Sequence, residues 1–196
     1  MKSKLILGSS SPRRLELINN IGFSPERIIA ADIDETPLKK EKPEIYVDRI
    51  ALEKIKKIES LLSEQELSEN YILTADTIAA VGTRILGKPS DRKDAKKILN
   101  LLSGRKHRVF TSVYVRSPNG ELKTRKTMTF VKFKRICDLE MEQYLDTDKW
   151  QGKAGAYGIQ EDAGGFVISI NGTFSGVIGL PLYETKCLLK GLGYIS

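Results

Sequence analysis

Hydrophobic and polar residues along the chain follow two periodicities, one typical of strands and one typical of helices. The strand pattern covers residues 4–8, 27–32, 71–81, 84–86, 107–116, 121–134 and 165–170. The helical pattern covers residues 13–21, 44–62, 91–102, 138–147 and 182–191. Because helices alternate with isolated strands and with a long hairpin, we expect an α/β fold built on a mixed sheet. The hairpin is compatible with a second lobe, although no linker composition marks its boundary.

The segment KLILGSSSPRRLELI, residues 4–18, combines a short strand, a hydroxyl-rich turn and the start of a helix. Serine is a good helix cap, and Pro12 stands in the first turn, where a helix tolerates proline. Free backbone N–H groups at such a helix start form an anion site. Arg13 and Arg14 beside it indicate a polyanion, whereas the alternative is a surface turn with two solvated arginines.

One lysine interrupts the apolar face of the long helix over residues 44–62. At about 100° per residue, that face comprises Val47, Ile50, Ala51, Ile55, Ile58, Leu61 and Leu62. Lys54 lies in the middle of this stripe. Because burying an isolated charge is costly, Lys54 must be paired, snorkel to water at the edge of the core, or line a cleft.

The segment YILTADTIAAV predicts a buried strand that carries one acid, Asp76. Desolvation disfavours the charged form of a carboxylate between apolar residues, so a cation or a metal is expected nearby. Such an acid is a candidate for a functional role. The alternative is a structural acid that bonds a neighbouring turn at the end of the strand.

The segment GTRILGKPS contains the spacing G-x-x-x-x-G-K of a P-loop, but its other residues do not fit that motif. Pro89 stands at the position of the magnesium-binding Ser or Thr, and residues 84–86 suit a hairpin strand. Lys88 still lies between a strand and a helix, where it can contact phosphate as a point charge.

Candidate metal ligands are carboxylates rather than imidazoles or thiolates. His107 is the only histidine, so it cannot complete a transition-metal site, and we interpret it as a structural or polar contact. The same lack of a well-placed base argues against a serine nucleophile. Asp32, Asp34, Glu35 and Asp76 remain, and oxygen ligands of this kind suit Mg²⁺ or Mn²⁺.

The segment from Lys149 to Leu182 is rich in glycine, with eight glycines between Gly152 and Gly179. Such density predicts tight turns and close backbone approach. Lys153, Tyr157 and Gln160 are polar groups set among these small residues, and this composition suits a crevice in which a base can stack and hydrogen-bond. A merely flexible loop is the alternative.

Composition limits the class of protein only moderately. Of the 196 residues, 40 % are hydrophobic and 29 % charged, which is ordinary for a soluble globular protein, and no apolar run is long enough to span a bilayer. Cys137 and Cys187 match no metal spacing and are expected as reduced thiols in the cytoplasm. The net charge of +7 favours anionic partners, either nucleic acid or a phosphorylated small molecule.

These segments, in this order, resemble the Maf family of nucleoside triphosphate pyrophosphatases. The matching blocks are SSSPRRLELI, then DIDET with the later ALEK, then ADTI with LGKPSDRKDAKKILNLLSGRKHRVFTSV, and finally GKAGAYGIQ with GGFV and VIGLPL. They cover most of the chain from residue 5 to about residue 185, and four linked blocks are far more specific than any one alone.

The resemblance implies a single catalytic unit over residues 1–196, with an elongated α/β fold and two lobes around a deep cleft, similar to the inosine triphosphate pyrophosphatases. It also implies a cytoplasmic enzyme that uses a divalent metal, Mg²⁺ or Mn²⁺. The implied reaction cleaves a nucleoside triphosphate between its α and β phosphates and gives a nucleoside monophosphate and pyrophosphate. A nucleoside triphosphate is then the expected partner, with no stable nucleic-acid or membrane partner, and the family suggests a homodimer.

The resemblance also assigns roles to individual residues. The proton acceptor falls on Asp76, and the metal ligands fall on Glu35 and Asp76. The phosphate contacts fall on Ser10, Arg13, Arg14, Lys54 and Lys88. The positions that decide the base are Arg13, Thr77 and Gln160, where the chain looks like members acting on dTTP and UTP rather than on 7-methyl-GTP.

Four cationic side chains would together offset roughly the four charges of a nucleoside triphosphate. Two departures from the family pattern, Gly8 in place of an alanine and Glu161-Asp162 in place of a glycine and an apolar residue, bear on the base preference more than on the reaction. Two rival functions stay open at this point: a hydrolase for modified nucleotides, and a basic module that binds nucleic acid.

Overall fold

The computed structural model describes residues 4–195, in which seven strands form one mixed sheet. The strand order is β2-β1-β3-β5-β6-β7, with β4 paired to β3 outside this path. The strands are β1 (Lys4–Gly8), β2 (Arg27–Ile28), β3 (Asn70–Val81), β4 (Arg84–Leu86), β5 (Lys106–Arg116), β6 (Leu122–Phe133) and β7 (Val167–Asn171). Strand β3 is parallel to β1 and antiparallel to β4 and β5, so it joins the two halves of the sheet.

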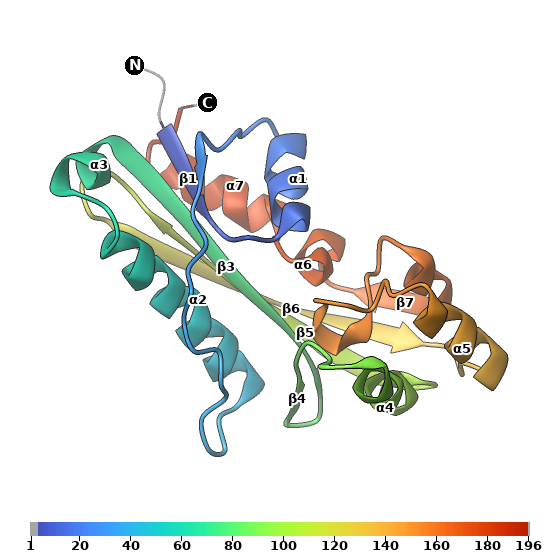
Figure 1. The fold of residues 1–196 in the computed structure, drawn as a ribbon. Coiled ribbons are helices and arrows are strands. Elements are labelled where there is room, and N and C mark those ends of the chain that lie inside the picture. The colour runs from blue at the N-terminus through green and yellow to red at the C-terminus, as the bar shows by residue number, and fades with distance from the viewer. Residues whose placement is uncertain (1–3, 196) are drawn as a thin grey trace.

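Helices cover both faces of this elongated sheet (Figure 1). Helix α2 (Pro43–Glu59) packs on one face, against β1, β3 and β5. Helices α6 (Phe174–Ile178) and α7 (Leu182–Gly191) pack against β5 and β6 on the other face, beside α1 (Pro12–Asn20). Helices α4 (Arg92–Leu102) and α5 (Asp138–Asp146) pack together at the opposite end from α3 (Glu64–Glu69).

Alternation along β1 and β3 divides the core between the two faces. Leu5 and Leu7 of β1 and Leu73 of β3 pack with the residues of α1 and α7. Ile6 and Ile72, one position away, pack instead with the apolar face of α2. The same alternation places consecutive residues of β3 on opposite faces, which decides where its polar side chains point.

The predicted α/β class and mixed sheet are confirmed, and most predicted elements agree with the structure to within a few residues. The strand predicted over residues 27–32 is wrong in length, because only Arg27–Ile28 pairs with β1. The helix predicted to residue 62 ends at Glu59, and Leu61 is therefore exposed rather than part of the apolar face.

Several short elements escaped the periodicity. Helix α3 starts at a capping box in which Ser63 and Glu66 bond each other's backbone N–H groups. The glycine-rich segment also contains three that were not predicted, the 3₁₀ helices η1 (Ala154–Ala156) and η2 (Asp162–Phe166) and helix α6, whereas β7 between η2 and α6 confirms the strand predicted over residues 165–170. The unpredicted elements are too short to show a period. No helix in residues 4–195 combines the length and the apolar character needed to cross a membrane.

Candidate active site

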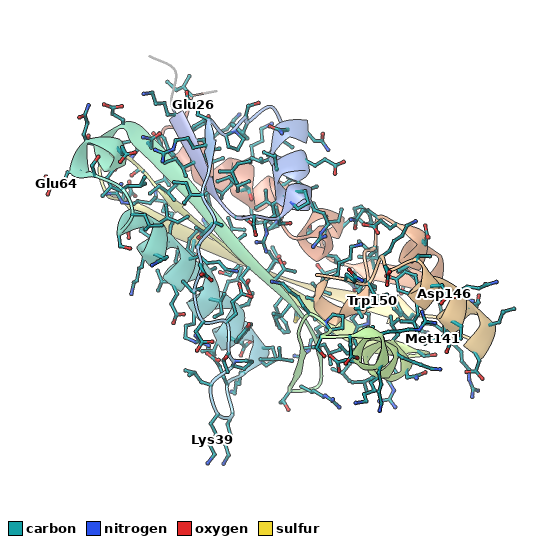
Figure 2. The ribbon with its side chains drawn as sticks, in the orientation of Figure 1. Glu26, Lys39, Glu64, Met141, Asp146 and Trp150 are labelled. Carbon is teal, nitrogen blue, oxygen red and sulfur yellow. The ribbon has the colours of Figure 1, made fainter. Side chains whose placement is uncertain are left out.

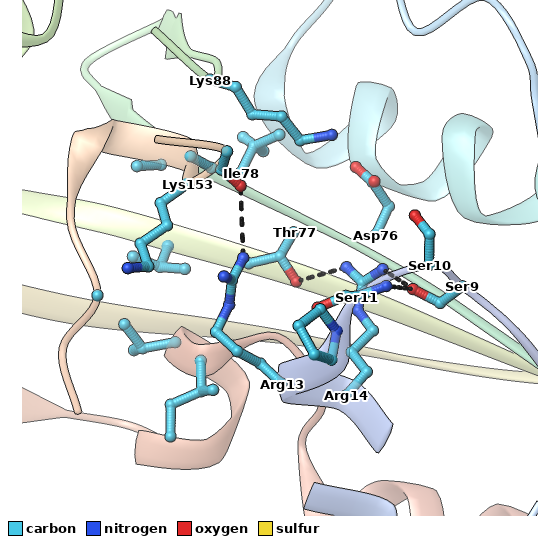
Figure 3. A pocket seen from close by; sticks show the side chains of 18 of the residues that line it. Ser9, Ser10, Ser11, Arg13, Arg14, Asp76, Thr77, Ile78, Lys88 and Lys153 are labelled. Carbon is cyan, nitrogen blue, oxygen red and sulfur yellow. Dashed lines mark hydrogen bonds between the residues drawn. The ribbon is translucent and has the colours of Figure 1, made fainter. Parts of the chain in front are cut away.

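A pocket of about 420 Å³ opens beside the carboxyl end of β1 and the middle of β3 (Figure 3). Strand β1 lies between β2 and β3 in the sheet. The chain passes from β1 to β2 on one side, and the next strand, β3, pairs with β1 on the other side. Crevices at the carboxyl ends of strands form at such a switch point. Every residue to which the family resemblance assigns a role lines this pocket: Ser10, Arg13, Arg14, Glu35, Lys54, Asp76, Thr77, Lys88 and Gln160.

The turn between β1 and α1 forms the first wall. Gly8 ends β1 where a Cβ would lie 2.5 Å from Ile58 and 2.6 Å from Thr74, so the strand lies unusually close to its neighbours. Pro12 is in the first turn of α1, as predicted, but the N-cap Ser11 makes no side-chain capping bond. Instead, the Oγ atom of Ser9 accepts a hydrogen bond from the backbone N–H of Ser11 at 3.2 Å. Ser9 therefore organises a turn on which Ser10 is left exposed to solvent.

Arg14 is fixed by three parts of the chain. Its guanidinium donates to the backbone oxygen of Gly179 at 2.8 Å, to Ser9 Oγ at 3.0 Å and to Thr77 Oγ1 at 3.4 Å. Burial lowers the pKa of Arg14 from its ordinary value, while the charge of Asp76 acts in the opposite direction. Arg13 is less constrained, since its closest acceptor is the backbone oxygen of Gly152 at 3.4 Å.

The buried lysine of α2 pairs with two acids in the pocket. Lys54 Nζ lies 2.7 Å from Asp76 Oδ1 and 2.7 Å from Glu35 Oε1, and its side chain is only 9 % exposed. The position of Lys54 on the apolar face follows the prediction, and the structure selects pairing at a cleft over snorkelling. Asp76 meets it because even-numbered residues of β3 face α2.

Asp76 has one oxygen without a protein partner. Its Oδ2 atom is buried and receives no hydrogen bond among the described residues. Burial raises the pKa of Asp76, against the opposing charges of Lys54 and Arg14. Partial burial also acts to raise the pKa of Glu35, but the hydrogen bonds and charges of Lys54 and Lys88 hold it below its ordinary value. The two carboxylates therefore differ in how readily they hold a proton.

Thr77 follows Asp76 and points to the other face of β3. Its Oγ1 atom lies 3.0 Å from Thr111 Oγ1 of β5 and accepts from Arg14. Gly179, whose carbonyl Arg14 also contacts, has φ +140°, a backbone region that favours glycine. A Cβ at that position would lie 3.4 Å from Arg14 Nε, an ordinary van der Waals contact, so the backbone conformation rather than a lack of space favours glycine here.

The opposite wall carries two exposed side chains, Lys88 and Gln160, and one buried lysine, Lys153. The Lys88 side chain is 60 % exposed, and its Nζ atom lies 3.4 Å from Glu35 Oε2. Gln160 is exposed and donates through its amide to Glu161 Oε1 at 3.2 Å. Lys153 lies opposite Asp76 in Figure 3 and pairs with Glu161 Oε2 at 2.6 Å, with 9 % of its side chain exposed. The sequence drew attention to Lys153 but indicated neither this pair nor the part that Glu161 takes in it.

A network that the sequence did not reveal holds the loop bearing Glu35. Tyr46 Oη of α2 donates to the backbone oxygen of Glu35 at 2.8 Å. Arg49 of α2 forms a fork with Glu41 at 2.7 and 2.8 Å and also donates to the backbone oxygen of Thr36. The tip of this loop, marked by Lys39, projects away from the molecule (Figure 2). The loop is thus tied to α2 at Glu35 and at the residues that follow it.

His107 supports the pocket from behind, in agreement with its predicted structural role. It is 2 % exposed, and its Nε2 atom lies 2.8 Å from the hydroxyl of Tyr157, which lines the pocket. Burial lowers the pKa of His107 to about 4. The imidazole is accordingly neutral at physiological pH.

The carboxylates present fit a divalent cation of the Mg²⁺ type only together with a bound phosphate. Three or more His, Cys, Asp or Glu side chains do not gather as a metal site anywhere in residues 4–195. Asp32 and Asp34, two of the acids considered from the sequence, are exposed and do not line the pocket. Glu35 and Asp76 remain, and Mg²⁺ is commonly held by one or two carboxylates plus phosphates and water. No protein group among the described residues bonds Oδ2 of Asp76.

Comparison with known proteins gives relatives over nearly the whole chain. A family model described as Maf-like protein matches residues 4–192. A protein of Agrobacterium fabrum named dTTP/UTP pyrophosphatase is 45 % identical over 98 % of this chain and 94 % of its own. One of Ehrlichia ruminantium, named nucleoside triphosphate pyrophosphatase, is 50 % identical over 95 % of this chain and 94 % of its own.

A more distant likeness links the chain to a solved structure. The crystal structure of a dITP/XTP pyrophosphatase from Mycobacterium abscessus overlaps 68 % of this chain and 75 % of that chain, with 16 % identity and a TM-score of 0.40. At these values the overlap supports no conclusion about function or fold. The expected similarity to inosine triphosphate pyrophosphatases therefore stays a prediction.

Proposed function

Since this chain belongs to the Maf family, we propose that it is a nucleoside triphosphate pyrophosphatase that releases a nucleoside monophosphate and pyrophosphate. The proposal rests on one observation above all. The four predicted phosphate-binding cations and the two predicted carboxylates, drawn from five separate parts of the sequence, line the same pocket. An array of this kind is what a polyphosphate with a divalent cation requires.

Phosphate binding falls to the cationic wall. Arg14 is already held by Ser9, Thr77 and Gly179, so its charge is in place before a ligand arrives. Arg13 and Lys88 are held less firmly and can move onto the outer phosphates. Ser10 is exposed in the turn between β1 and α1. Preorganised charges of this kind stabilise the charge that develops on the leaving pyrophosphate.

Proton transfer falls to Asp76. Water attacks the α phosphorus, the bond from that phosphorus to the bridging oxygen breaks, and pyrophosphate departs with the electron pair. The water proton passes to the unpartnered Oδ2 of Asp76, while Lys54 holds the other oxygen. Burial, which raises the pKa of Asp76, brings its proton affinity closer to that needed of a base at neutral pH.

Glu35 and Asp76 would hold the divalent cation, Mg²⁺ or Mn²⁺. When bound, such a cation neutralises phosphate charge and lowers the pKa of coordinated water. Lys54 pairs with both acids and thus shields them from each other in the free protein. The whole chain, residues 1–196, would act as one catalytic unit of two lobes in the cytoplasm, where Cys137 and Cys187, both free in the described residues, would stay reduced.

The base is expected to lie against the exposed wall. Arg13, Thr77 and Gln160 line the pocket, and relatives named dTTP/UTP pyrophosphatase support a preference for thymine and uracil. Hydroxyl and amide groups can reject a base that leaves them unpaired. A role toward modified nucleotides is the second candidate, and a homodimer stays part of the proposal without a structural observation behind it.

The test is a panel of standard and modified nucleoside triphosphates with pyrophosphate and orthophosphate assayed separately. We expect pyrophosphate, loss of activity in EDTA, and higher rates on dTTP and UTP than on purine nucleotides. Orthophosphate alone, or turnover unaffected by EDTA, contradicts the proposed reaction. A modified nucleotide at the top of the ranking supports the second candidate and leaves the reaction intact.

A further inference from the structure

We propose that Glu161 is a positioning residue that sets the base specificity of the pocket by fixing the amide of Gln160. The inference rests on the proposed function, since it concerns which base that site accepts. Glu161 does not itself line the pocket, whereas Gln160, Gly158 and Lys153 do. Its carboxylate lies directly behind the wall that these three residues form.

Both oxygens of the Glu161 carboxylate are engaged. Oε2 accepts from Lys153 Nζ at 2.6 Å, and Oε1 accepts from the side-chain amide of Gln160 at 3.2 Å. Gly158 passes close over this pair, because a Cβ there would lie 3.0 Å from Lys153 Cε and 3.2 Å from Glu161 Cδ. Lys153 also donates to the backbone oxygen of Lys149, so the lysine is held from two sides. The carboxylate is thus bonded through both oxygens, although 29 % of the Glu161 side chain stays exposed.

An ion-paired carboxylate can only accept hydrogen bonds. The Gln160 atom that contacts Glu161 must therefore be the NH₂ group, and the carbonyl oxygen is left as the atom available to a ligand. Without Glu161, either end of the amide could face the pocket with similar energy. The carboxylate of Glu161 therefore fixes the orientation of the Gln160 amide, so that its carbonyl oxygen acts as a hydrogen-bond acceptor toward the ligand.

The carbonyl oxygen of Gln160 can distinguish pyrimidine bases by whether their N3 atom carries a hydrogen. Uracil and thymine carry an N–H donor at N3, whereas cytosine carries a lone pair there. A carbonyl oxygen opposite N3 therefore bonds uracil and repels cytosine, two bases of almost equal size. The substrate class that the arrangement favours is a nucleoside triphosphate whose pyrimidine has a protonated N3.

The experiment compares kcat/KM for UTP and CTP in the wild type and in Glu161→Gln. Glutamine keeps the shape but can donate as well as accept, so the amide of Gln160 is free to turn. The UTP-to-CTP ratio should fall by about tenfold, on the scale of one hydrogen bond, with CTP turnover rising while kcat for UTP stays within about threefold. A general loss of packing would lower both substrates together and leave the ratio unchanged.

Asp162→Asn is the matched control. Asp162 is the next residue, pairs with exposed Lys149 at 2.8 Å and does not line the pocket. Its loss should leave the ratio unchanged. Because Glu161→Gln leaves the buried Lys153 without its counter-charge and could prevent folding, the double variant Lys153→Met/Glu161→Gln removes both charges together. The same fall in the ratio is expected there.

Two failures are distinguishable. If the wild type releases pyrophosphate from none of these nucleotides, the proposed function fails and this inference fails with it. If the wild type prefers UTP but both Glu161 variants keep that preference, or if Asp162→Asn loses it equally, only the role of Glu161 is overturned. A wild type that does not separate UTP from CTP overturns it as well.

Discussion

Two walls of the pocket each carry a lysine but hold it in different ways. On the wall formed by β3 and α2, the side chains of Lys54 and Asp76 are 9 % and 8 % exposed and bond each other. On the wall formed by the β4–α4 connection, the Lys88 side chain is 60 % exposed, and its partner among the described residues, Glu35 Oε2, is 3.4 Å away. The first wall is fixed by the protein itself, whereas the second is free to move toward a ligand.

The difference teaches where the chemistry and the capture of substrate belong. A buried, cross-bonded charge keeps its position without a ligand, which suits stabilisation of a transition state. An exposed lysine is screened by solvent and salt, which suits attraction and loose contact. We therefore expect changes on the β3–α2 wall to act on kcat, and changes on the opposite wall to act on KM.

Asp76→Asn should produce the largest effect. It keeps the shape but removes both the charge and the proton acceptor, so kcat should fall by about 100-fold or more. Because burial raises the pKa of Asp76, its charged form is unfavourable in the fold, and stability without metal should hold or rise. Kinetics and thermal melting on one preparation check both results. Near-normal kcat with a lower Tm would mean that Asp76 is only a structural acid.

Lys54→Met should come next. The variant leaves Asp76 and Glu35 facing each other without the cation between them, so kcat should fall strongly and the Tm should drop. The two carboxylates, no longer paired with a lysine, should also bind Mn²⁺ more tightly in the absence of nucleotide, which calorimetry measures. Lys56→Met on the exposed side of α2 is the control and should change none of the three. An active and more stable Lys54→Met would show that the lysine only fills the edge of the core.

Acid titration of stability tests the support behind the exposed wall. The pKa of His107 is about 4 in the fold against its ordinary 6.5, so the unfolded chain takes up this proton first as pH falls. The contribution of neutral His107 is thus complete above pH 6.5 and is lost progressively toward pH 4, by about 3 kcal/mol in total. His107→Phe should flatten the loss of stability in that window. If the free energy of unfolding falls equally with pH in both proteins between pH 7 and 4, His107 does not contribute to this loss.

Lys88→Met should give the smallest of these effects. KM for the nucleotide should rise by about tenfold with kcat reduced less, and the Tm should stay unchanged because the side chain is exposed. The rise should shrink at high salt, where the wild type loses the same attraction. Lys97→Met on exposed α4 surface is the matched control. A loss of kcat as large as that of Lys54→Met would erase the distinction between the two walls.

Much of the fold was predictable because strand and helix periods are strong in long elements such as β3 and α4. The end of α2 was not, because Leu61 continues the apolar period after the backbone has left the helix. Helix α3 had a readable signal in Ser63 and Glu66, the two ends of its capping box. The strand predicted over residues 27–32 was too long, because an apolar run shows β propensity but does not show over how many residues a neighbouring strand can pair with it.

The candidate site was predictable as a set of anomalies but not as an arrangement. Lys54 and Asp76 each stood out as a charge on an apolar face, yet nothing in the sequence states which turn of α2 lies over which residue of β3. That relation comes from packing between elements far apart in the chain. The same limit hid the bond between Tyr46 and the loop of Glu35, and the pair of Lys153 with Glu161.

The bond from Arg14 to the carbonyl of Gly179 joins positions 165 residues apart in the chain. Closing so long a segment has an entropic cost that grows with the logarithm of its length, and long-range contacts of this kind slow folding. Any state in which α6 and α7 are undocked leaves this arginine without its principal acceptor, however well the sheet has formed. Order in the anion-binding turn is therefore a late property of the chain, and amide hydrogen exchange near Arg14 should report the docking of the C-terminal helices.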